Sequence, residues 1–120
     1  CLFFSTLVSC QQKGEDFESV STDEFATLIA DPDIQRLDVR TVAEYSEEHI
    51  PGSININVLD EQFAVIADST LQKDKPIALY CRSGKRSKKA ATILSRKGYK
   101  VYDLDKGFIG WKEAGKETEK

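Results

Sequence analysis

Short apolar segments alternate with amphipathic ones along most of the chain, and this alternation predicts strands and helices in turn. Segments with the length and pattern of strands lie at residues 17–20, 34–39, 53–57, 77–80 and 101–104. Helical spacing of apolar residues predicts helices over residues 21–31, 41–48, 59–67, 87–97 and 107–114. Strands that alternate with helices indicate an α/β fold with a central, mainly parallel sheet and helices on both faces.

Local signals mark where several of these helices begin and end. Ser21 with Glu24, and Thr41 with Glu44, have the spacing of a capping box, in which two polar side chains satisfy the first free amides of a helix. Gly98 follows the helix expected over residues 87–97 and is a suitable stop for it. The element order therefore rests on these end signals as well as on periodicity.

The segment 77–80 reads Ile-Ala-Leu-Tyr and lacks polar alternation, which predicts a central strand that is buried on both faces. In open parallel sheets, functional sites lie at the carboxyl ends of the strands. Cys81 follows this strand directly. We therefore expect Cys81 to lie in a functional site, although most free cysteines are small buried packing residues.

Composition and charge narrow the function classes. The chain has 120 residues, 40% of them apolar and 31% charged, which fits one domain with a modest core. The net charge is 17 − 20 = −3, so there is no overall attraction to nucleic acid or to an anionic membrane. The three cysteines and the single His49 have no metal-binding spacing, and we expect neither a metal nor a cofactor.

Residues 1–16 differ from the rest of the chain. Leu2–Val8 is mostly apolar but too short to span a bilayer, and it is similar to the end of a signal peptide. Leu7-Val-Ser-Cys10 resembles a bacterial lipobox, in which Cys10 would be lipidated. This predicts an exported, periplasmic or membrane-anchored lipoprotein. The alternative is a frayed apolar end with an incidental cysteine, in which case the protein is cytoplasmic.

The lipobox hypothesis bears on Cys81. If Cys10 carries lipid and Cys1 is removed with the leader, Cys81 is the one thiol that remains in the mature chain. The mature protein would then hold this thiol in an oxidising compartment without an internal disulfide partner. A structural disulfide at Cys81 is excluded under this hypothesis.

The loop after Cys81 has the composition of an anion cradle. Its backbone amides, together with a helix that we expect to be capped by Ser83 or Ser87, can stabilise negative charge. Glycine permits a tight turn there, and three cations add positive charge, which favours the thiolate over the thiol. The loop consists of Arg82, Ser83, Gly84, Lys85, Arg86 and Ser87. Lys88 and Lys89 come next and are expected to face solvent.

With these motifs, the chain resembles a single-domain rhodanese, a sulfurtransferase, over residues 17–115. Four segments match the family in order, and together they make the resemblance specific. They are Leu37-Asp-Val-Arg40 followed by Glu44-Tyr45, His49-Ile-Pro-Gly-Ser-Ile-Asn55, Tyr80-Cys-Arg-Ser-Gly-Lys-Arg-Ser87 and Asp105-Lys-Gly-Phe-Ile-Gly-Trp111. Outside the matched range, we expect residues 1–16 to be a remnant signal and lipobox segment with a linker, and residues 116–120 to be a charged tail. Lys106 departs from the family, which often has a glycine there.

The resemblance implies the chemistry. Cys81 would take a sulfane sulfur from a small anionic donor such as thiosulfate, or from a persulfide or polysulfide, and become a persulfide. It would pass the sulfur to cyanide or to a thiol, which could belong to a partner protein. The amides of residues 82–87 would hold the persulfide. Asp38, Arg40 and Glu44 would support the loop, and His49 would be structural.

Two other functions remain open. Cysteine phosphatases also place a thiolate in an amide cradle, but their loop reads C-x5-R, whereas Cys81 to Arg86 is C-x4-R. The shorter loop favours a single sulfur over a tetrahedral phosphate. A non-catalytic rhodanese-like binding module is the second alternative, although such modules commonly lose the cysteine that this chain keeps.

Overall fold

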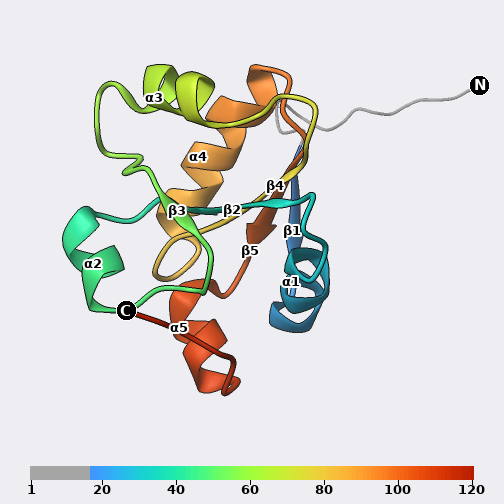
Figure 1. The fold of residues 1–120 in the computed structure, drawn as a ribbon, viewed down its shortest axis with the longest axis vertical. Coiled ribbons are helices and arrows are strands. Elements are labelled where there is room, and N and C mark those ends of the chain that lie inside the picture. Colours follow the sequence, from blue (N-terminus) through green and yellow to red (C-terminus); the bar gives the residue numbers. More distant parts are fainter. Residues whose placement is uncertain (1–16) are drawn as a thin grey trace, which may run out of the picture.

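The structure, a computed structural model, describes residues 17–120. Within this range, one sheet has the strand order β1-β5-β4-β2-β3, and all its neighbouring strands are parallel (Figure 1). The strands are β1 (Phe17–Val20), β2 (Gln35–Asp38), β3 (Ile54–Asn55), β4 (Ile77–Tyr80) and β5 (Val101–Leu104). The helices are α1 (Thr22–Ile29), α2 (Val42–Glu47), α3 (Phe63–Thr70), α4 (Lys85–Arg96) and α5 (Gly107–Glu113). The predicted element order and the parallel α/β fold are confirmed.

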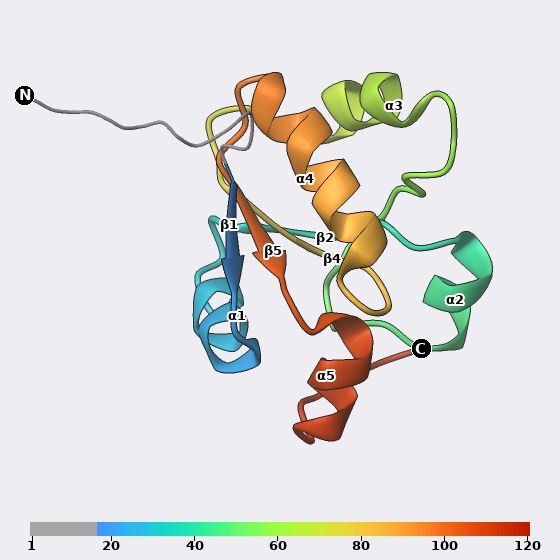
Figure 2. The same ribbon diagram turned by 180° about the vertical axis from the view of Figure 1, so that it is seen from behind.

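Helices cover both faces of the sheet, as the two opposite views show (Figures 1 and 2). On one face, α3 and α4 bury Phe63, Ala67, Ala91 and Leu94 against the strands. On the other face, α1 and α5 bury Phe25, Ile29, Phe108 and Trp111. Burial of apolar surface on both faces is the main source of stability in such a layered domain.

The central strand β4 is buried along its whole length, as its sequence predicts. The hydroxyl group of Tyr80 accepts a hydrogen bond from the backbone N–H of Ile50 at 3.0 Å and lies 3.0 Å from the hydroxyl of Ser53. These contacts satisfy the one polar atom that this strand brings into the core. The strand end that leads to Cys81 is thereby fixed in place.

Both capping boxes are formed. The side chains of Ser21 and Thr41 accept from the backbone amides of Glu24 and Glu44, and each glutamate returns a contact to the backbone amide of its cap. Helix α1 buries two residues, but α2 buries none. Polar contacts therefore hold α2 in the fold.

Two helix starts differ from the sequence-based expectation. Helix α4 begins at Lys85, two residues early, and its N-cap is Gly84, so the expected caps Ser83 and Ser87 are wrong. Gly84 has φ 98°, a left-handed conformation that glycine adopts without strain. Helix α3 begins at Phe63, because the side chain of Asp60 binds the amide of Gln62 in a preceding turn.

Residues 116–120 pack on the domain. The backbones of Glu119 and His49 exchange two hydrogen bonds, and the indole N–H of Trp111 donates to the carbonyl of Glu117 at 2.7 Å. The end of the chain lies beside α2 in both views (Figures 1 and 2). Among residues 17–120, no helix is long and apolar enough to cross a membrane. Cys10 lies outside the described residues.

Candidate active site

Cys81 lies where β4 ends and the loop to α4 begins. Its side chain is 1% exposed, and its sulfur accepts a hydrogen bond from the backbone N–H of Gly84 at 3.1 Å. In the described part of the chain it is the free cysteine. Of the loop amides expected to surround the sulfur, the Gly84 amide is the one with a hydrogen bond to it in the described residues. The loop turns back towards Cys81, so that its Gly84 amide donates to the thiol sulfur.

The first turn of α5 is hydrogen-bonded to the backbone at the start of the loop. The backbone N–H groups of Phe108 and Ile109 donate to the carbonyls of Cys81 and Arg82, at 2.8 and 3.0 Å. Gly107, with φ 65°, packs so closely on the Arg82 carbonyl that a β-carbon would overlap it. Lys106 has φ −87°, a conformation that any residue adopts, so the lysine at this position causes no backbone strain.

Arg86 joins the loop to α2. Its two terminal nitrogens donate to the two carboxylate oxygens of Glu44, each at 2.9 Å, in a bidentate pair. The Thr41 side chain and backbone amide also donate to Glu44. The hydrogen bonds from Arg86 are the largest cause that lowers the pKa of Glu44, from its ordinary 4.5 to about 2. The Arg86–Glu44 ion pair therefore connects the loop to α2 across the site.

The Arg86–Glu44 ion pair predicts that the protein loses stability at acidic pH. A carboxyl whose pKa is depressed in the folded state contributes stability above its unfolded value, and that contribution disappears as the pH falls through the folded value. Glu44, 26% exposed, should contribute about 2 kcal/mol after solvent screening. In urea titrations, Glu44→Gln should be less stable than wild type at pH 6, and the difference should vanish towards pH 2.

Glu47→Gln is the matched control for this titration, since Glu47 lies on the same helix and is exposed. Its stability difference from wild type should stay small across the same pH range. A Glu44→Gln difference that stayed constant from pH 6 to pH 2 would contradict the proposed ion-pair origin.

The other two supporting residues predicted from the sequence, Asp38 and Arg40, lie near the Arg86–Glu44 ion pair. Asp38 is fully buried, and its carboxylate accepts from the guanidinium of Arg40 at 2.6–3.0 Å and from the backbone N–H of Arg40. Arg40 also donates to the carbonyl of Glu48 at the end of α2, at 2.7 Å, and lies 4.4 Å from the centre of the Phe108 ring. This buried pair connects β2, α2 and α5 below the loop.

The remaining loop residues divide into exposed and buried groups. Arg82, Ser83 and Lys85 are exposed, so both cations are accessible to a solute that approaches the loop. Ser87 is fully buried in the first turn of α4, and its hydroxyl has no hydrogen-bond partner among residues 17–120. The first amides of a helix also lack partners within the helix. Free donors therefore gather at this helix start.

The sequence predicts that Lys88 faces solvent, but the structure shows that its side chain is bound to the protein. Its ammonium donates to the carboxylates of Asp103 and Asp105 and to the carbonyl of Gly84. Lys89 is exposed, as expected. Asp103, fully buried on β5, was not identified from the sequence. The only available signal was a charge inside an otherwise apolar strand.

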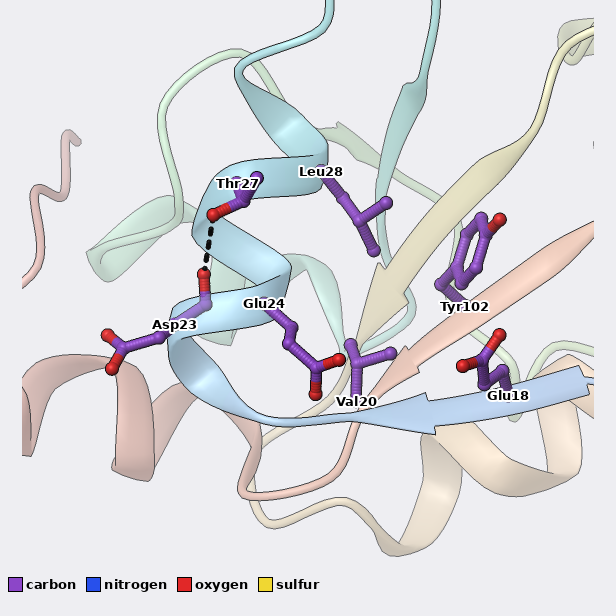
Figure 3. A pocket seen from close by; sticks show the side chains of 7 residues that line it. All are labelled: Glu18, Val20, Asp23, Glu24, Thr27, Leu28 and Tyr102. Carbon is purple, nitrogen blue, oxygen red and sulfur yellow. Dashed lines mark hydrogen bonds between the residues drawn. The ribbon is translucent and has the colours of Figure 1, made fainter.

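One surface hollow lies beside the loop, and another lies away from it. One of about 270 Å³ lies beside the loop and is lined from α2, α5 and the loop by Arg40, Glu44, Glu47, Glu48, Arg82, Phe108, Ile109 and Lys112. Another, of about 480 Å³, lies between β1, β5 and α1, with Glu18, Asp23 and Glu24 around Val20 and Leu28 (Figure 3). None of residues 81–87 lines this second hollow, so it is separate from the thiol.

No group of three or more His, Cys, Asp or Glu side chains that could hold a metal ion occurs within residues 17–120. His49 contacts the carbonyl of Tyr45 and the carboxylate of Glu119 through its two ring nitrogens. It does not contact Cys81 in these interactions.

Comparison with known proteins adds to this geometry. The model of the rhodanese-like domain family matches residues 21–114. A sulfurtransferase of Allochromatium vinosum is 32% identical over 98 residues, which are 80% of this chain and 89% of that protein. The thiosulfate sulfurtransferase GlpE of Coxiella burnetii is 34% identical over 98 residues, covering 80% and 88%. The crystal structure of a rhodanese-related protein from Thermoplasma volcanium superposes with a TM-score of 0.75 at 29% identity, covering 86% of this chain and 98% of that one.

Proposed function

The chain belongs to the rhodanese-like family, and we propose that it is a sulfurtransferase that carries a sulfane sulfur on Cys81. The observation that best supports this proposal is the hydrogen bond from the Gly84 amide to the Cys81 sulfur, in a loop that ends at a helix start. Such a contact favours a negatively charged sulfur. Relatives named sulfurtransferase and thiosulfate sulfurtransferase agree with this reading.

The proposed reaction has two steps. The Cys81 thiolate attacks the outer sulfur of thiosulfate, the S–S bond of thiosulfate breaks, and sulfite leaves with the bonding electron pair. In the second step, cyanide or a thiolate acceptor attacks the terminal sulfur of the persulfide. The persulfide S–S bond breaks, thiocyanate or a new persulfide forms, and the Cys81 thiolate is regenerated. No oxidant or reductant is consumed in addition to the donor and the acceptor.

The free donors at the helix start suit the intermediate. A persulfide extends one sulfur beyond the thiol, and its terminal sulfur carries negative charge. The amides of Lys85 and Arg86 and the buried hydroxyl of Ser87 would donate to it, since helix starts leave such groups without partners. The exposed cations Arg82 and Lys85 would attract an anionic donor to the loop.

Phosphate transfer is the poorer alternative. A phosphatase needs its loop arginine to bind the phosphate, but both terminal nitrogens of Arg86 are engaged by Glu44. The loop is also one residue shorter than C-x5-R. The site therefore favours transfer of a single sulfur atom.

Intact-mass spectrometry tests the proposal. After exposure to thiosulfate, the wild-type protein should gain the mass of one sulfur atom, located by fragmentation at Cys81, and should lose it when cyanide is added. The same preparation should hydrolyse an aryl phosphate far more slowly than it forms thiocyanate. Absence of the mass gain with thiosulfate, persulfide and polysulfide donors, or faster phosphate hydrolysis, would refute the sulfur-transfer function.

A further inference from the structure

Lys88 ties the cysteine loop to the neighbouring strand. Its ammonium lies 3.1 Å from the carbonyl oxygen of Gly84, 2.9 Å from Oδ2 of Asp103 and 3.0 Å from Oδ1 of Asp105. These three acceptors match the three N–H donors of an ammonium group. One side chain thus bonds simultaneously to the loop, to β5 and to the turn that follows β5.

Asp103 explains why Lys88 adopts this position. Asp103 is fully buried on β5, where its register partners are Ser19 on β1 and Leu79 on β4. Its Oδ2 also accepts from the Ser19 hydroxyl at 2.9 Å, whereas its Oδ1 has no partner among the described residues. A buried carboxylate requires a cation nearby. Burial alone would lower the pKa of Lys88, but its hydrogen bonds to Asp103 and Asp105 raise it above the ordinary value.

The consequence for the thiol comes through Gly84. The backbone N–H of Gly84 donates to the Cys81 sulfur, and its carbonyl accepts from Lys88. In a trans peptide, the C=O and the next N–H point in opposite directions. Lys88 therefore fixes the orientation of the peptide that carries the Lys85 amide, the first amide of α4, as well as the position of Gly84.

Gly84 is also confined by its packing. A β-carbon at this residue would overlap the carbonyl of Asp105, so loop and turn are in close contact. Lys88 bonds to both sides of that contact. The Arg86–Glu44 pair holds the other end of the loop on α2. Together with the α5 amides that bind the carbonyls of Cys81 and Arg82, these contacts fasten the loop on three sides, and the Lys88 hydrogen bond ends on Gly84 itself.

We propose that Lys88 is a positioning residue for sulfur transfer, which holds the Gly84 carbonyl so that the loop amides face the sulfur on Cys81. This inference rests on the proposed sulfurtransferase function. Lys88 would not contact the donor, because its ammonium is already engaged by three oxygens. Its loss should slow the reaction without weakening donor binding.

Lys88→Met tests this role, with Lys89→Met as the matched control, since Lys89 is the adjacent lysine and is exposed. Small displacements of catalytic groups have large rate effects, so Lys88→Met should lower the maximal rate of persulfide formation about tenfold or more. The half-saturating thiosulfate concentration should change less than about twofold, because binding cations remain. Lys89→Met should behave as wild type. A wild-type maximal rate in Lys88→Met would overturn the proposal.

Asp103→Asn separates positioning from charge balance. Lys88→Met leaves the buried Asp103 charge without its cation, so its melting temperature should fall. In the double variant Lys88→Met/Asp103→Asn, the charge imbalance is gone and the melting temperature should recover. The rate should stay low, because the Gly84 carbonyl still lacks its donor. Recovery of the rate together with the melting temperature would overturn the positioning role.

Amide hydrogen exchange keeps the inference separate from the proposed function. The Gly84 amide, measured by NMR, should exchange at least about tenfold faster in Lys88→Met and in the double variant than in wild type or Lys89→Met. If wild type forms no persulfide but this difference is present, the sulfurtransferase function fails while Lys88 still holds the loop. An unchanged Gly84 exchange rate would show that Lys88 does not hold it.

Discussion

Replacement of Cys81 by serine is expected to abolish sulfur transfer while the fold remains intact. Serine is slightly smaller, and its hydroxyl oxygen can accept the Gly84 amide in place of the sulfur, so the buried site keeps its hydrogen bond. A hydroxyl, however, is a far weaker nucleophile and cannot form a persulfide. Thiocyanate formation from thiosulfate and cyanide should fall by at least about 10³-fold.

The Cys81→Ser variant should keep the fold of the wild type but should not take up sulfur. Circular dichroism and the melting temperature should match wild type within a few degrees, and the mass gain after thiosulfate exposure should be absent. Cys10→Ser should retain both the rate and the mass gain, which would exclude sulfur loading at that residue. Transfer by Cys81→Ser at more than a few per cent of the wild-type rate would mean that Cys81 is not the sulfur carrier.

The largest stability effect is expected at Asp38. Asp38→Ala would leave the guanidinium of Arg40 buried and charged without its carboxylate, since arginine does not lose its proton in a folded protein. Removal of one partner of a buried ion pair typically costs about 3–5 kcal/mol. Urea unfolding of Asp38→Ala should show a loss of this size in the free energy of unfolding.

Asp33→Ala is the matched control for Asp38→Ala. Asp33 forms a long surface contact to Lys75 at 3.8 Å, and its side chain is 78% exposed. Exposed pairs contribute little, so the loss should be below about 1 kcal/mol. Similar losses for the two variants would show that the Asp38–Arg40 pair is not a major support of the fold.

Much of the fold could be predicted because local sequence determines it. The capping boxes at Ser21 and Thr41 need only residues three positions apart, and both formed as expected. The unbroken apolar run 77–80 predicted its own burial. The expectation that Cys81 lies in a functional site followed from a general rule about parallel sheets. The resemblance in four segments indicated the family that the comparisons then established.

The contacts that complete the site could not be predicted in the same way. Glu44 and Arg86 are 42 positions apart, and the pairing of their side chains depends on where α2 packs. Lys88 follows two other cations, and its pattern is that of a solvated helix face. Its role depends on the hydrogen bond to Asp103. Asp103 lies close to Lys88 because β5 pairs with β4, the strand that leads to the loop and α4. The start of α4 at Lys85 depends on the left-handed Gly84, whose conformation is set by packing on Asp105.

The strand order has a consequence for how the protein is made. β1 is at the edge of the sheet and pairs with β5, so Phe17 must wait for Val101, 84 residues later in synthesis, before its strand is complete. Contacts so distant in sequence make folding slow and postpone it until nearly the whole chain is available. Lys88 likewise has no Asp103 or Asp105 to bind until β5 is in place. A nascent chain that ends before residue 101 should therefore lack both a complete sheet and an ordered cysteine loop, so sulfur-carrying ability should arise only when the last strand docks.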